Sequence, residues 1–182
     1  MSTSAIRNAR SWFHQAASDA RTAEALSSAP APMDAADSGC HVAAMCAQAI
    51  EKSLKGYLLL NGVVPGMDHR PDKYLAALLT RDGRLLQHPE HHAALARLFD
   101  APTKAAVREL LDLTPGGRGN RHDVANTEYP WQELGGGEWR NAPHGAATFA
   151  DQKLISQWLG VAVRVRAGLH KLFIAADRGM AA

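Results

Sequence analysis

The sequence is short of cysteine, of excess charge and of long apolar runs, and each shortage excludes a class of protein. Only two cysteines occur in 182 residues, so a small disulfide-rich scaffold is excluded. Cys40 and Cys46 lie six positions apart on one expected helix, which puts them on different faces and out of disulfide reach. Two unbridged thiols fit a reducing cytoplasm. A net charge of +2 permits a nucleic-acid partner without requiring one.

Apolar residues rarely stand in unbroken succession. The run 57–60 is far below the roughly 20 residues that a membrane-spanning helix needs. The first ten residues place apolar side chains only at amphipathic spacing, whereas a signal peptide has a continuous apolar stretch. The hydrophobic fraction of 46% and the charged fraction of 21% are typical of a globular protein. We expect a soluble, cytoplasmic protein without membrane contact, formed by one domain over residues 1–182.

The chain is rich in helical periodicity, in which apolar residues recur at intervals of three and four. Core helices are expected at 4–28, 40–61, 71–80 and 146–176. Weaker helical patterns occupy 83–87, 90–100 and 102–113. No segment shows a convincing strand pattern. The sequence therefore predicts an all-α protein, an up-and-down antiparallel helical bundle with extra short helices.

The segment 81–145 is expected to be an insertion that ends in a long loop. Within it, residues 114–145 contain seven glycines, three prolines and two of the four tryptophans, without helical or strand periodicity. Loops of this length in compact domains are usually functional or disordered. The aromatic residues Tyr129, Trp131 and Trp139 indicate that parts of this loop pack against the bundle.

One face of the expected helix 40–61 is polar and cationic. Side chains three and four positions apart share a helix face, and here they are His41, Met45, Gln48, Lys52 and Lys55. We regard all of these except Met45 as candidate ligand-binding residues. Glu51 precedes Lys55 by four positions, the favourable order for a salt bridge along the helix. Such a salt bridge is the main alternative to a role in binding phosphate or RNA.

The order of residues in this helix resembles the second helix of the HEPN domain family. The family pattern Gln-Ala-x-Glu-Lys-x-Leu-Lys, followed by a Leu-rich turn and a Gly, is matched from Gln48 to Gly62. Gly66 and His69 stand where the family places a turn and a His before a short third helix, and the resemblance extends over about 9–171. It implies a HEPN-type bundle, a homodimer that pairs through long helices, and a candidate binding role for His69.

In the ribonuclease branch of that family, an Arg and a His separated by four to six residues lie near the start of the last core helix. The His can transfer a proton at the ribose 2′-hydroxyl or the leaving oxygen, and the Arg stabilises charge on the phosphate. Arg118 with His122 and Arg140 with His144 are near matches, each with three intervening residues, and Asn141 is the polar residue after Arg140. These residues are candidate catalytic residues.

Family members that carry Tyr-Pro, found here as Tyr129-Pro130, commonly lack the nuclease motif. The resemblance therefore favours a nucleotide- or RNA-binding protein that works beside a minimal nucleotidyltransferase. One alternative is a metal-independent endoribonuclease, the toxin of a toxin-antitoxin system. A second is a structural bundle that binds a protein partner through the Trp-containing loop.

Other polar clusters give weaker signals. The loop 116–121 combines glycines with guanidinium groups suited to phosphate, which makes Arg121 a further candidate ligand-binding residue, yet it lacks the ending of a P-loop. The histidines of 88–92 match no standard zinc spacing, so no metal or other cofactor is expected. Arg164 and Lys171 form a basic edge on the last helix, which is usually only a solvated face.

Overall fold

The structure of the protein is a computed structural model that describes residues 3–28, 35–66, 71–79, 91–113, 131–132, 139–140 and 147–179. Its helices are α1 (Thr3–Ser28), α2 (Ala35–Leu60), α3 (Pro71–Leu79), α4 (His92–Leu98), α5 (Ala101–Asp112), α6 (Ala147–Ala150) and α7 (Gln152–Gly179). The predicted helix at 83–87 lies outside the described residues. The prediction of an all-α bundle is confirmed, apart from one short pair of strands.

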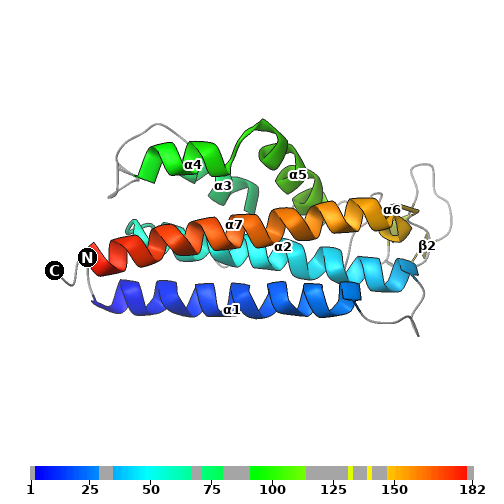
Figure 1. Ribbon diagram of the computed structural model, residues 1–182, viewed down its shortest axis with the longest axis horizontal. Coiled ribbons are helices and arrows are strands. Elements are labelled where there is room, and N and C mark those ends of the chain that lie inside the picture. The colour runs from blue at the N-terminus through cyan, green and yellow to red at the C-terminus, as the bar shows by residue number, and fades with distance from the viewer. Residues whose placement is uncertain are drawn as a thin grey trace.

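The long helices α1, α2 and α7 lie side by side, and α3, α4 and α5 cover the side of α2 and α7 that faces away from α1 (Figure 1). Helix α1 runs antiparallel to α2, and the path from α4 to α5 runs antiparallel to α7 (Figure 1). Successive long segments therefore alternate in direction, as an up-and-down bundle requires. Helices α2 and α7 run in the same direction and pack directly against each other.

The start of α2 was predicted five residues too late. The helix continues back from Cys40 to Ala35, and Ser38 Oγ donates a hydrogen bond to the carbonyl oxygen of Leu26 in α1. Gly39 is needed here, because a Cβ atom would overlap the carbonyl oxygen of Phe149 in α6. Contacts with other helices thus fix a start that the local sequence does not indicate.

The end of α2 agrees with the prediction. Gly62 has a φ of 78°, the left-handed conformation that glycine adopts most easily. The amide of Val63 donates to the carbonyl oxygen of Leu58, and the amide of Gly62 donates to that of Leu59, both at 3.0 Å. This is a Schellman motif, which satisfies the last carbonyl groups of the helix.

The last predicted helix, 146–176, is interrupted at Asp151. Its Oδ1 accepts hydrogen bonds from the amides of Lys153 at 2.9 Å and Leu154 at 3.1 Å, so Asp151 caps the N-terminus of α7. The residues before it form the separate short helix α6. The prediction of one continuous helix was wrong at this point, because the capping potential of an Asp competed with a continuing apolar pattern.

Two short strands lie in the segment predicted to be a loop. β1 (Trp131–Gln132) and β2 (Trp139–Arg140) pair antiparallel, with Trp131 opposite Arg140 and Gln132 opposite Trp139. Two residues per strand leave no room for an alternating pattern, which explains why the sequence did not reveal them.

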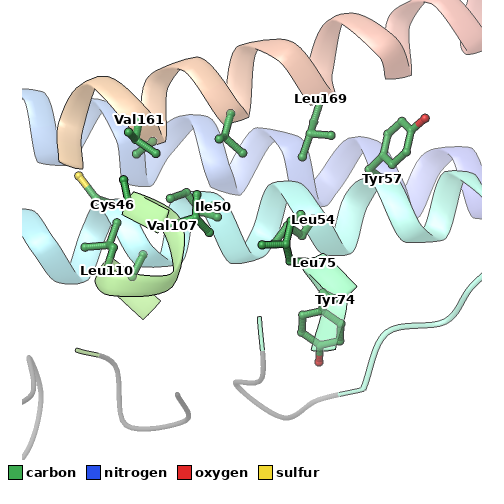
Figure 2. Packing of buried hydrophobic residues seen from close by; sticks show 14 of the residues in the cluster. Cys46, Ile50, Leu54, Tyr57, Tyr74, Leu75, Val107, Leu110, Val161 and Leu169 are labelled. Atoms are coloured by element: carbon green, nitrogen blue, oxygen red, sulfur yellow. The ribbon is translucent and has the colours of Figure 1, made fainter. Parts of the chain in front are cut away.

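One cluster of buried side chains extends through the bundle. In the part shown in Figure 2, Val107 and Leu110 of α5 pack beside Cys46 and Ile50 of α2 and below Val161 of α7. Burial raises the pKa of the Cys46 thiol to about 12, so this thiol is neutral and unreactive at physiological pH. No helix in the described ranges is long and apolar enough to cross a membrane.

Candidate functional site

The polar face of α2 lies against α1 over part of its length. Lys52 Nζ donates to Asp19 Oδ2 of α1 at 2.6 Å and to Gln48 Oε1, one turn earlier on α2, at 3.2 Å. Asp19 Oδ1 accepts a further hydrogen bond from Gln15 Nε2 at 3.1 Å. The side chain of Lys52 is 20% exposed and that of Asp19 is 8% exposed, so solvent screens the ion pair only partly. These four residues are the seam cluster.

One turn further along α2, Glu51 and Lys55 form a buried ion pair. Lys55 Nζ lies 2.7 Å from Glu51 Oε1. The Lys55 side chain is only 3% exposed and the Glu51 side chain is 10% exposed. Lys55 Nζ also lies 5.2 Å from the ring centre of Trp12 in α1 and 5.2 Å from that of Tyr74 in α3. Aromatic faces stabilise a cation at this range. The salt bridge expected as the alternative to ligand binding at Lys55 is present.

The charges on this side of α2 balance. Each of the two lysines has a carboxylate oxygen within 2.7 Å. A phosphate would have to displace that carboxylate, and at Lys55 it would also have to enter the bundle. His41 lies near the start of α2 and is exposed, more than two turns of helix before Lys52. Gln48 and Lys52 therefore lie together, and through the contact of Lys52 with Asp19 they help to hold α1 against α2.

The remaining predicted site residues lie mainly outside the described part of the chain. Those outside it are His69, Arg118, Arg121, His122, Asn141 and His144. The backbone of Arg140 lies in β2, opposite Trp131. Both Arg/His pairs therefore stay predictions.

A second cationic surface lies on α7. Lys153, Arg164, Lys171 and Arg178 are exposed and follow one another at intervals of eleven, seven and seven residues. At about 100° per residue, these intervals return each side chain to nearly the same face of the helix. We call these four residues the α7 stripe. The exposed residues between them on that face include Gly160, Ala167 and Ala175.

Helix α7 is strongly basic for its length. It contains five Lys or Arg residues and a single acidic residue, Asp177. Asp177 Oδ2 is already engaged by Arg10 Nη2 of α1 at 2.8 Å. The helix therefore carries a formal charge of +4, twice the net charge of +2 of the whole chain. No carboxylate of the described residues forms an ion pair with Lys153, Lys171 or Arg178.

Arg164 is the member of the stripe that is held in place by other side chains. Its Nη2 donates to Thr103 Oγ1, in the first turn of α5, at 2.6 Å. Asp100 caps that turn by accepting from the Thr103 amide at 2.9 Å. Hydrogen bonds from Thr103, and then the charges of Arg164 and Lys104, lower the pKa of Asp100. Arg164 therefore has an acidic neighbour, whereas Lys171 and Arg178, the next two members of the stripe, form no ion pair with a carboxylate of the described residues.

The side of α7 that faces α1 carries a histidine. The His170 ring stacks on Phe173, with centres 6.0 Å apart and an interplanar angle of 14°, and lies 5.3 Å from the ring of Phe13. Burial, followed by the positive charges of Arg166 and His14, lowers the pKa of His170. At neutral pH the imidazole is therefore mostly uncharged, and it adds little to the basic surface.

The weaker histidine cluster is only partly described. His91 is buried, and its Nδ1 lies 2.7 Å from the hydroxyl oxygen of Tyr57, whereas His92 is exposed. His88 and Glu90 lie outside the described residues. No group of three metal-ligating side chains is found in the part of the chain that the structure describes.

The sequence reading found only half of the α7 stripe. It identified Arg164 and Lys171 but missed Lys153 and Arg178, although intervals of seven and eleven residues were available as a signal. It also missed Asp19 as the partner of Lys52, because Asp19 lies 33 positions away on another helix. Helical spacing alone cannot reveal such a partner.

The chain has no match among models of known protein families, curated proteins or solved structures.

Proposed function

We propose that this protein is a HEPN-like helical module that binds nucleotide or RNA through the α7 stripe. The observation that carries the proposal is the row of four exposed cations on one face of a helix whose single acidic residue is paired with Arg10. Clustered Lys and Arg side chains on one face attract phosphate and release the counterions bound to it. The HEPN-like residue order in α2 supports the choice of ligand.

The proposal assigns different roles to the two groups of cations. Lys52 joins α2 to α1 through Asp19, and Lys55 is neutralised by Glu51 of its own helix and lies between the rings of Trp12 and Tyr74. Lys171 and Arg178 contact the ligand, because they are exposed without an acidic partner among the described residues. The sequence-based assignment of ligand binding to the α2 face therefore moves to α7.

The wider setting follows from the residue resemblance alone. We propose a cytoplasmic homodimer that acts beside a minimal nucleotidyltransferase protein. Sedimentation of the purified protein tests the dimer, and co-purification with a nucleotidyltransferase encoded next to it tests the partner.

The binding experiment measures fluorescence anisotropy of labelled RNA, and the displacement of that RNA by nucleotides, at about 50 mM salt. The variant Lys171→Glu/Arg178→Glu should weaken binding about tenfold or more, because each cation lost removes a phosphate contact. The matched variant Arg97→Glu/Arg108→Glu changes the net charge equally, on exposed positions of α4 and α5, and should bind normally. Equal losses in both variants would show a non-specific charge effect and would contradict the assignment to α7.

The endoribonuclease alternative rests on a sequence observation, the Arg140-Asn141 pair followed by His144. It predicts that RNA is cut in EDTA, because no metal takes part in this mechanism. Cleavage should disappear in His144→Ala, or in His122→Ala if the other pair is active. Uncut RNA that is nevertheless bound would support binding without catalysis, and RNA neither cut nor bound would favour the partner-binding bundle.

A further inference from the structure

The α7 stripe is long compared with a nucleotide. Lys153 and Arg178 are 25 residues apart, which corresponds to about 37 Å along the helix axis. Neighbouring members are separated by seven or eleven residues, or roughly 10 to 17 Å. The phosphates of a single nucleotide are linked directly to one another, so a nucleotide can reach at most two neighbouring cations and not the whole stripe.

We infer that the ligand of the α7 stripe is a polynucleotide, bound along α7 through its phosphodiester backbone. This inference rests on the proposed function, and it chooses between the nucleotide and the RNA named there. With phosphates about 3.4 Å apart along a stacked strand, the stripe spans about eleven nucleotides. Each cation then has a phosphate within reach, which a shorter ligand cannot provide.

The surface around the stripe suits contact with the backbone and not with bases. The exposed positions between the cations include Gly160, Ala167 and Ala175, and a Cβ atom added at Gly160 would meet nothing within 4 Å. Small residues allow a strand to approach the helix closely. The Trp and Phe side chains of α7, Trp158 and Phe173, are both 0% exposed, and the half-buried His170 ring is already stacked on Phe173, so these rings offer no platform for base stacking. Binding is therefore independent of base sequence.

An anionic membrane is the other large polyanion that a basic helix can meet. Helices that bind membranes insert an apolar face below the lipid headgroups. In α7 that face is already buried in the bundle, by residues that include Ile155, Val165 and Leu169. Val64 is the only large hydrophobic residue that is exposed in the described structure, and it does not lie on α7. The surface therefore fits a polynucleotide better than a lipid bilayer.

The experiment uses single-stranded RNAs of about 3, 6, 12 and 24 nucleotides, a duplex of the longest, and free ATP and GMP as competitors. Affinity should rise steeply up to about 12 nucleotides and then only slowly, with equal values for uridine and adenosine homopolymers. The slope of log affinity against log salt should be about −3 for four contacts on a single strand, at about −0.7 per contact. The duplex has the same phosphodiester backbone as the single strand but is stiffer, so its affinity shows whether binding requires a flexible strand.

The variants connect this result to the stripe. Lys171→Glu/Arg178→Glu should reduce the magnitude of the salt slope by about 1.4, at about 0.7 per contact, whereas Arg97→Glu/Arg108→Glu should leave it unchanged. Circular dichroism verifies that both variants fold. A nucleotide that binds as tightly as the 12-mer would overturn the inference and leave the proposed function standing. Failure of every RNA and nucleotide to bind would overturn both, and binding only to phosphatidylserine vesicles would assign the stripe to lipid.

Discussion

The α1/α2 seam and the outer face of α7 both place lysines at helical intervals, yet they present those lysines in opposite ways. On the seam, Lys52 and Lys55 each lie within 2.7 Å of a carboxylate and are largely shielded from water. On α7, Lys171 is exposed, with no acidic partner in the described structure. The role of a row of lysines therefore depends on which carboxylates lie beside them in the fold, whether these come from the same helix or from a neighbouring one.

The largest effect on stability is expected from breaking the buried ion pair. Glu51→Ala leaves the charge of Lys55 without its carboxylate in a site that is 3% exposed, and such a change typically costs about 3–5 kcal/mol. Urea denaturation followed by circular dichroism measures the loss. The double variant Glu51→Met/Lys55→Met removes both charges and should recover most of it. A Glu51→Ala protein of wild-type stability would show that the pair does not hold the bundle together.

A smaller loss is expected in the seam cluster. Asp19→Asn removes a charged hydrogen bond of 2.6 Å to Lys52, worth about 1.5–3 kcal/mol. The cost should stay below that of Glu51→Ala, because Lys52 is 20% exposed and can turn toward water. A double-mutant cycle of Asp19→Asn with Lys52→Gln should reveal coupling between the two side chains. Strictly additive losses would contradict the ion pair.

The face of α7 that carries the stripe offers a substitution that should stabilise the protein. Gly160 lies in mid-helix with open space around it, so Gly160→Ala should add up to about 1 kcal/mol through helix propensity. Gly56→Ala is the matched control, because its Cβ would lie 3.1 Å from the Phe13 ring and 3.2 Å from the carbonyl oxygen of Ala9. The midpoint temperature of thermal unfolding should rise for Gly160→Ala and fall for Gly56→Ala. A fall for Gly160→Ala would mean that this face of α7 is covered.

The smallest effect concerns pH. The pKa of His170 is lowered in the folded protein, so below the ordinary His value of about 6.5 the unfolded state binds more protons than the folded state. The contribution of His170 to the free energy of unfolding is therefore fully present above pH 6.5. It is lost as the pH falls through the lowered pKa that His170 has in the folded protein. His170→Phe should flatten the stability profile in this window, measured by urea denaturation between about pH 5 and 7. An unchanged profile would show that other groups cause the dependence.

The sequence correctly predicted those helices and helix ends that are determined by local signals within the helix itself. Helix α1 and the C-terminus of α2 follow the expected pattern, since apolar periodicity and Gly62 are local signals. The start of α2 depends on contacts with Leu26 and Phe149, which the residues before Cys40 do not reveal. Asp151 is a residue type that favours the N-cap of a helix, but the apolar periodicity continues across it, so the sequence predicted one continuous helix there.

In the candidate site, the sequence predicted the charged side chains but not always the residue with which each one forms an ion pair. The pairing of Glu51 with Lys55 was expected, because four positions on one helix bring the two together. The pairing of Asp19 with Lys52 joins two helices, and nothing in either helix alone specifies it. The exposure of Lys171 likewise becomes clear only when the helices around α7 are in place.

The most direct test compares the same substitution in the two regions. Lys171→Gln and Lys52→Gln each replace one lysine by one glutamine, and both the RNA affinity and the stability of each variant are measured in the same buffer. We predict that Lys171→Gln weakens RNA binding and leaves the free energy of unfolding unchanged, whereas Lys52→Gln lowers that free energy and leaves the affinity of the folded protein unchanged. Weaker RNA binding in Lys52→Gln, with normal binding in Lys171→Gln, would return the binding site to α2 and contradict the account.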